Sequence, residues 1–217
     1  MWFHPAVRPI LIPIVLLLLC LGLGLLVRGE PAPGFDRDLT NTMQRAFDGP
    51  AHDALWVTTR VLYTPWNFLI GAALSVVAAL TRGYRAGFVV LLSMVLLLGA
   101  VEIMKPAFGR LRPAASAPAG EARSARSYVS GHVGWTAATL TAFALVMARR
   151  RKARILAVSL AGVVTAWVAT SRLHLGRHYL TDALGSALLA AAVVLLVDAA
   201  LPRSRPSQTS SGPPPAA

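Results

Sequence analysis

The sequence predicts an all-α fold: an integral membrane bundle of six transmembrane helices, with an amphipathic surface helix between the first and the second. Hydrophobic residues make up 55% of the 217 residues and charged residues only 14%, whereas soluble domains average about 25% charged residues. The mean hydropathy is +0.59, so the apolar residues exceed what one protein core hides. They also gather in six long runs. We expect one membrane unit over residues 1–201.

Six stretches without Asp, Glu, Lys or Arg mark the predicted spans. A helix needs about 20 residues to cross the hydrocarbon, within a range of roughly 17–25. The first two runs meet this length, and the other four meet it only if polar residues at their ends belong to the helices. The runs are Pro9–Val27, Val61–Thr81, Ala86–Val101, Val133–Ala148, Ile155–Ser171 and Ala183–Val197.

The first run is expected to remain as a helix rather than to be removed as a signal peptide. Its apolar stretch is longer than the roughly 7–15 residues of a signal peptide, and no small-residue cleavage site follows Val27. It contains the single cysteine, Cys20, which has no second cysteine for an internal disulfide. We interpret Cys20 as a packing or lipid-facing residue.

An amphipathic helix is predicted on the membrane surface after the first span. Phe35, Leu39, Met43 and Phe47 repeat every four residues, which is the spacing of one helix face, and Gly49-Pro50 is expected to end the helix. Four aspartates accompany these apolar residues. A solvated helix face is favoured over a metal site for Asp36, Asp38, Asp48 and Asp53.

The basic residues predict the orientation in the membrane. The net charge is +12, but the basic residues lie between apolar runs, so no nucleic-acid partner is expected. Residues 149–154 hold five Lys or Arg side chains and anchor a short cytoplasmic loop. We therefore expect a multi-pass protein of the plasma membrane with both termini in the cytoplasm. The Pro/Ser-rich tail, residues 202–217, is expected to be disordered.

Polar residues flank four of the spans on the face of the membrane opposite to that loop. Ionisable residues close to a bilayer mark functional sites by default, and nothing in the apolar periodicity requires these groups to meet. In chain order they are Lys105, Arg112, Ser130, His132, Ser171, Arg172, His178 and Asp182.

The cations in this group are suited to binding phosphate. Arg offers a bidentate fork and Lys a compact charge, so Lys105, Arg112 and Arg172 are expected to neutralise a phosphoryl group. Ser130 and the backbone N–H groups that begin the fourth span are expected to hold phosphate oxygens. Glu102 lies three residues before Lys105 and is placed to pair with it.

Two histidines supply the groups for phosphoryl transfer. His178 and Asp182 are four residues apart, so they share a helix face, and a carboxylate beside an imidazole fixes its tautomer. This arrangement favours a histidine nucleophile. His132 lies on another helix and is a candidate general acid for the leaving oxygen.

These residues together resemble the three-part signature of the type 2 phosphatidic acid phosphatase (PAP2) superfamily. The matching patterns are Lys105-x6-Arg112-Pro113, Ser130-Gly131-His132 and Ser171-Arg172-x5-His178-x3-Asp182, and the motif core covers residues 101–186. In the second motif Val129 stands where the family usually has proline. That departure leaves every chemical group in place but removes a fixed φ before the fourth span.

The resemblance implies a PAP2-type bundle and a role for each motif residue. His178 would attack phosphorus to form a phosphohistidine, Asp182 would orient it, and His132 would protonate the leaving group. The phosphoryl oxygens would be bound by Lys105, Arg112, Ser130, Gly131 and Arg172. The scheme needs no metal and no other cofactor.

The predicted function is a membrane lipid phosphatase acting at the outer face. The expected substrate is an isoprenyl diphosphate such as undecaprenyl diphosphate, followed by phosphatidate or phosphatidylglycerol phosphate. The alternatives are a lipid phosphotransferase, which shares every catalytic residue, and a catalytically impaired lipid-phosphate-binding protein, for which Val129 is the only support. A transporter is disfavoured because no pair of broken mid-membrane helices repeats between the two halves. Arg110 and Arg177 are placed to touch a diphosphate, and His174 is expected to pack.

Overall fold

The computed structural model describes residues 8–28, 32–63, 65–113 and 126–201, and within these ranges every regular element is a helix. The all-α prediction is confirmed. The tail at 202–217 lies outside the described residues. The helices are α1 (Arg8–Leu26), α2 (Gly34–Arg45), α3 (Pro50–Val61), α4 (Trp66–Arg82), α5 (Tyr84–Phe108), α6 (Gly131–Met147), α7 (Arg151–His174) and α8 (Leu180–Ala200).

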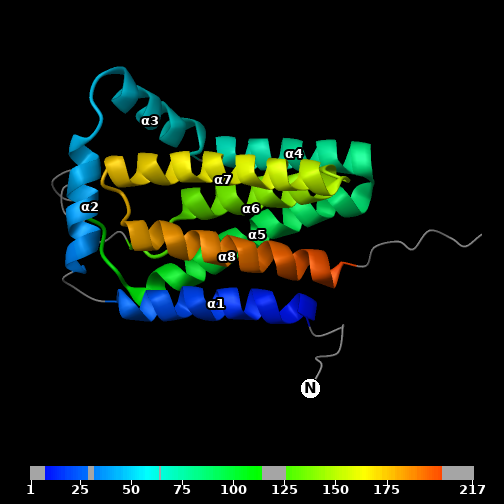
Figure 1. The fold of residues 1–217 in the computed structure, drawn as a ribbon, viewed down its shortest axis with the longest axis horizontal. Helices are drawn as coiled ribbons and strands as arrows, with labels where there is room; N and C mark the ends of the chain where they lie inside the picture. The colour runs from blue at the N-terminus through cyan, green and yellow to red at the C-terminus, as the bar shows by residue number, and fades with distance from the viewer. Residues whose placement is uncertain (1–7, 29–31, 64, 114–125, 202–217) are drawn as a thin grey trace, which may run out of the picture.

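Helices α1, α4, α5, α6, α7 and α8 run alongside one another, and α2 lies across one end of this bundle (Figure 1). Helix α1 packs against α8, α4 against α5, and α6 against α5, α7 and α8. Helices α5 and α7 finish at the end of the bundle that α2 covers, and α6 and α8 begin there. The predicted site residues therefore meet at this end.

Apolar side chains cover the outside of the bundle. Leu80 is 82% exposed and Leu156 is 72% exposed, which suits a lipid solvent rather than water. Helices α5, α7 and α8, with 25, 24 and 21 residues, are long and apolar enough to cross a membrane, while α1 and α6 are apolar but shorter. The chain is a helical membrane bundle, and the number of six spans stays a prediction.

Two boundaries differ from the predicted ones around the second span. Pro50 was expected only to end the surface helix, but it begins α3, because proline suits the first turn of a helix, where its missing N–H is not needed. The next helix, α4, begins at Trp66 rather than at Val61, and its axis lies at 69° to that of α3.

The surface helix α2 is present, but its buried face differs in part from the predicted one. Asp36 was expected on the solvated face, and this was wrong: its side chain is 0% exposed, whereas Phe35 is 57% exposed. Leu39 and Met43 pack against the bundle as expected. Asp38 is exposed.

Candidate active site

A glycine turn at the end of α5 brings the first motif back towards the bundle. Gly109 has φ 62°, a left-handed conformation that suits glycine, and its N–H bonds to the Lys105 carbonyl at 3.1 Å. Lys105, in the last turn of α5, pairs with Glu102 at 2.5 Å, as the sequence predicted. Beyond the turn, the carbonyl of Arg110 accepts the N–H of Ser127 at 2.7 Å.

Residues 127–130 form the segment that leads into α6 and supplies the second motif of the site. The side chain of Tyr128 is fully buried and its hydroxyl donates to the Cys20 carbonyl of α1. It occupies a slot against α8 in which an added Cβ at Gly185 would lie only 2.5 Å from the Tyr128 hydroxyl oxygen. Cys20 is buried with a free thiol. This packing fixes the backbone that leads into α6, where Ser130 is the N-cap.

His178 lies between α7 and α8 and is 2% exposed. Its Nδ1 is 2.9 Å from the carbonyl oxygen of Ser127, and since a carbonyl only accepts, Nδ1 carries the hydrogen and donates it. The ring's other nitrogen, Nε2, then keeps its lone pair. Burial lowers the pKa of His178 to about 4, and the nearby Asp182 only partly offsets this. The neutral ring is thus the favoured form at physiological pH.

Asp182 lies in the first turn of α8 and accepts hydrogen bonds from more than one partner. Its Oδ2 accepts the backbone N–H of Tyr179 at 2.9 Å and lies 3.5 Å from Nδ1 of His178. Its Oδ1 accepts from Arg110 at 2.6 Å. The nearer acceptor for His178 is therefore the Ser127 carbonyl, which sequence motifs do not reveal because it is a backbone group.

The cationic side of the site comes from α5, α7 and the loops beside them. Arg172 is 5% exposed and donates to the Thr59 hydroxyl of α3 at 3.3 Å. Burial and the charge of Arg177 lower the pKa of Arg112, which indicates that these cations crowd one another. Four charged or chargeable groups act electrostatically on His132: Arg172, His178, Arg112 and Lys105.

Four buried polar atoms of the motif residues have no hydrogen-bond partner among the described residues. They are Nε of Arg112, Oγ of Ser130, Nε2 of His132 and Nε of Arg172. Buried polar atoms are nearly always paired in native proteins, and three of these four residues carry N–H donors suited to an anion. The structure thus brings together the groups that the sequence singled out for phosphate.

Comparisons with known proteins identify the family of the chain. The PAP2 superfamily matches residues 86–206 of the chain. The chain belongs to the PAP2 superfamily. A search of curated proteins gave no match.

A solved PAP2 structure shares the fold. It is the crystal structure of a transmembrane PAP2-type phosphatidylglycerolphosphate phosphatase from Bacillus subtilis, with TM-score 0.74 and 22% sequence identity. The match covers 86% of this PAP2 chain and 94% of that one. The likeness therefore extends beyond the motif region to most of the helices described above.

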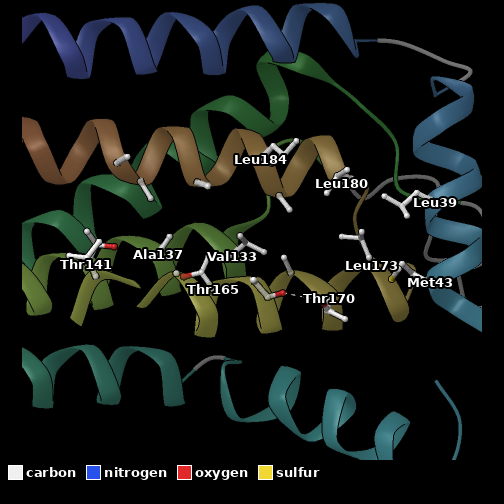
Figure 2. A pocket seen from close by; sticks show the side chains of 18 residues that line it. Leu39, Met43, Val133, Ala137, Thr141, Thr165, Thr170, Leu173, Leu180 and Leu184 are labelled. Atoms are coloured by element: carbon white, nitrogen blue, oxygen red, sulfur yellow. Dashed lines mark hydrogen bonds between the residues drawn. The ribbon is translucent and has the colours of Figure 1, made fainter. Parts of the chain in front are cut away.

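An apolar groove lies in the bundle of this PAP2 protein, lined by chain neighbours of the site residues. It has a volume of about 560 Å³ and lies between α6, α7 and α8, with Leu39 and Met43 of α2 at one end (Figure 2). Val133 and Leu180, which follow His132 and His178 closely in the chain, line it near the site. The sequence analysis did not locate this groove, because its lining residues come from four separate helices.

Two histidines outside the motifs bond to each other. Nδ1 of His52 and Nε2 of His174 lie 2.9 Å apart, and Nδ1 of His174 bonds to the Met43 carbonyl at 2.8 Å. His174 therefore ties α7 to α2 and α3, in agreement with its predicted packing role. In the described part of the chain no cluster of three or more His, Cys, Asp or Glu side chains is suited to a metal ion.

Proposed function

We propose that this PAP2 protein hydrolyses a lipid phosphate or diphosphate through a phosphohistidine at His178. The observation that carries the proposal is the juxtaposition of a buried imidazole, whose Nδ1 donates to the Ser127 carbonyl at 2.9 Å, with unpaired polar atoms on Arg112, Ser130 and Arg172. A nucleophile with a free lone pair beside donors for phosphoryl oxygens is the minimum that phosphoryl transfer requires.

The reaction takes two steps at one phosphorus. Nε2 of His178 forms a bond to phosphorus as the bond from phosphorus to the leaving oxygen breaks, and His132 gives that oxygen a proton. His132 then takes a proton from water, whose oxygen attacks the phosphohistidine and releases phosphate and neutral His178. Lys105, Arg112, Arg172, Ser130 and the Gly131 amide hold the oxygens whose charge grows in both steps. These protein cations do the neutralising, and the scheme uses no metal.

The substrate is a lipid whose tail lies in the apolar groove and whose head lies among the cations Lys105, Arg112 and Arg172. Arg177 adds a fourth cation beside Arg112 and Arg172. A diphosphate carries more negative charge than a phosphate monoester, so we place isoprenyl diphosphates ahead of phosphatidate and phosphatidylglycerol phosphate. The chain crosses the plasma membrane six times, with the site on the outer face and both termini in the cytoplasm.

Phosphate release by the purified protein tests the proposal. The protein in detergent with EDTA is given undecaprenyl diphosphate, phosphatidate or phosphatidylglycerol phosphate. We expect release that persists in EDTA and is abolished in a folded His178→Ala variant. Release that continues in this variant would refute the nucleophile, and transfer of phosphate to a lipid alcohol in place of water would identify a phosphotransferase.

A pair of variants on α8 tests whether the groove binds the lipid tail. Ala187 lines it on α8, and Ala199 lies exposed on the same helix away from it. Ala187→Trp is expected to raise KM for a long-chain substrate and to leave a short-chain soluble phosphate unaffected. Ala199→Trp should behave as wild type with both substrates.

A further inference from the structure

The surface helix α2 contributes a buried carboxylate to the site. Asp36 is 0% exposed, while the other three aspartates of the segment, Asp38, Asp48 and Asp53, are exposed. Its Oδ2 accepts from Arg110 at 2.7 Å and from the Thr181 hydroxyl at 2.5 Å, and its Oδ1 accepts the Thr181 N–H at 3.2 Å. Burying a carboxylate is costly unless it is paired. Here the partners of Asp36 are Thr181, in the first turn of α8, and Arg110, which itself bonds to that turn.

Arg110 is the partner that connects Asp36 with the catalytic segment. It is 1% exposed. One terminal nitrogen donates to Asp182 at 2.6 Å and to the Thr181 hydroxyl at 2.6 Å, and the other donates to Asp36. The ring of Tyr179 lies 4.2 Å beneath the guanidinium carbon. A planar guanidinium whose two terminal nitrogens bond to different carboxylates, and whose face rests on an aromatic ring, is fixed in one orientation.

Both acceptors near Nδ1 of His178 are held by Arg110. The side chain of Arg110 holds the carboxylate of Asp182, and its backbone carbonyl accepts the N–H of Ser127 at 2.7 Å. The Ser127 carbonyl and the Asp182 carboxylate lie 2.9 Å and 3.5 Å from Nδ1. The orientation of the His178 ring therefore depends on Arg110, and that of the Arg110 fork depends on Asp36.

We infer that Asp36 and Arg110 are positioning residues that set the orientation and tautomer of the His178 imidazole from the surface helix α2. The inference deepens the proposed function and rests on it. Without the Asp36 carboxylate the guanidinium keeps a single anionic partner and rotates towards it, which displaces Asp182 from Nδ1. The carboxylate oxygens of Asp36 and the terminal nitrogens of Arg110 are already bonded to each other, to Thr181 and to Asp182, so the turnover step depends on them and substrate binding does not.

The test compares Asp36→Asn with Asp38→Asn, which makes the same charge change at an exposed position of the same helix. We expect kcat of Asp36→Asn to fall about 100-fold, the order of loss caused by a misplacement near 1 Å, with KM within about twofold of wild type. Asp38→Asn should match wild type in both. Long-range ¹H–¹⁵N spectra of histidine-labelled protein, with His178 assigned by its loss in His178→Gln, should show the Nδ1–H tautomer in wild type and Asp38→Asn but a mixture in Asp36→Asn.

The outcomes separate this inference from the proposed function. A folded Asp36→Asn protein with wild-type kcat and an unchanged His178 tautomer would overturn the inference. If the wild-type protein hydrolyses no lipid phosphate, the proposed function fails, and the tautomer spectra still decide the positioning role. If Asp36→Asn does not fold, Arg110→Lys decides in its place, because a single ammonium keeps the positive charge but lacks the fork that donates to Asp36 and Asp182 together. A His178 tautomer that is unchanged in a folded Arg110→Lys protein would then refute the positioning role.

Discussion

Lowering the pH is expected to leave His178 uncharged far below the range in which histidine ordinarily titrates. The ring is 2% exposed, and burial lowers its pKa from 6.5 to about 4. At pH 5 roughly 90% of such a ring is neutral, against roughly 3% for a histidine of pKa 6.5. Since the neutral ring is the proposed nucleophile, the capacity for attack should be kept at pH 5 and lost only as the pH falls through about 4.

The same pKa difference predicts the sign of a stability change. Between pH 6.5 and 4 the unfolded chain binds a proton at this histidine and the folded chain does not, so acid favours unfolding. The contribution of His178 to the free energy of unfolding is fully present above pH 6.5. It should decline as the pH falls, by about 3 kcal/mol in total.

Histidine ¹⁵N chemical shifts, followed in detergent from pH 7.5 to well below pH 4, measure this titration directly. The spectrum of His178→Gln identifies the His178 signals among the five histidines of the chain. A titration midpoint near 6.5 would refute the account of burial, and an Nε2–H tautomer at pH 7 would refute the bond from Nδ1 to the Ser127 carbonyl.

Three further predictions concern residues around the site. Gly185→Ala should lower the free energy of unfolding by about 1–3 kcal/mol, because the new Cβ would lie 2.5 Å from the Tyr128 hydroxyl. The control Gly99→Ala, where nothing lies within 4 Å of the added Cβ, should not lower it. Equal unfolding temperatures for the two variants would contradict the described packing of Tyr128 against Gly185. Thr59→Val removes the hydroxyl that accepts from Arg172 at 3.3 Å and should raise KM about 2–10-fold, the worth of one hydrogen bond; steady-state kinetics check it, and an unchanged KM would show that Arg172 needs no support from α3. Arg177→Gln should weaken the binding of diphosphate substrates more than that of monophosphates. An equal loss of binding for both classes would remove the argument for a diphosphate preference.

Most of the helices were predictable because each follows from a local run of apolar residues. Uncharged apolar runs predicted α1, α5, α6, α7 and α8 to within a few residues at most ends, and polar residues at the run ends extend several of these helices. The region around Pro50 and Trp66 was predicted less well. There a proline can end one helix or begin the next, and α3, which begins at Pro50, packs against α7, a contact that the local sequence does not reveal.

The candidate site was likewise predictable only where the signal is local in the sequence. The motif side chains were recognisable from their spacing, and the structure places them together at one end of the bundle. Asp36 was misplaced because its partners Arg110 and Thr181 lie 74 and 145 residues away in the chain, and a four-residue periodicity carries no information about such pairs. The Ser127 carbonyl was missed because any residue type supplies one.

The long separation between Asp36 and Thr181 also bears on how the protein is made. Helices α1 and α2 leave the ribosome first, whereas α8 is the last helix of the described chain to be synthesised. The contacts of Asp36 with Thr181, and of Arg110 with Asp182, therefore form only when nearly the whole chain is in the membrane. Until then Asp36 remains in water on a surface helix, where its charge costs little. Assembly of the nucleophile's surroundings is thus coupled to completion of the bundle, and a chain arrested before α8 carries no formed site.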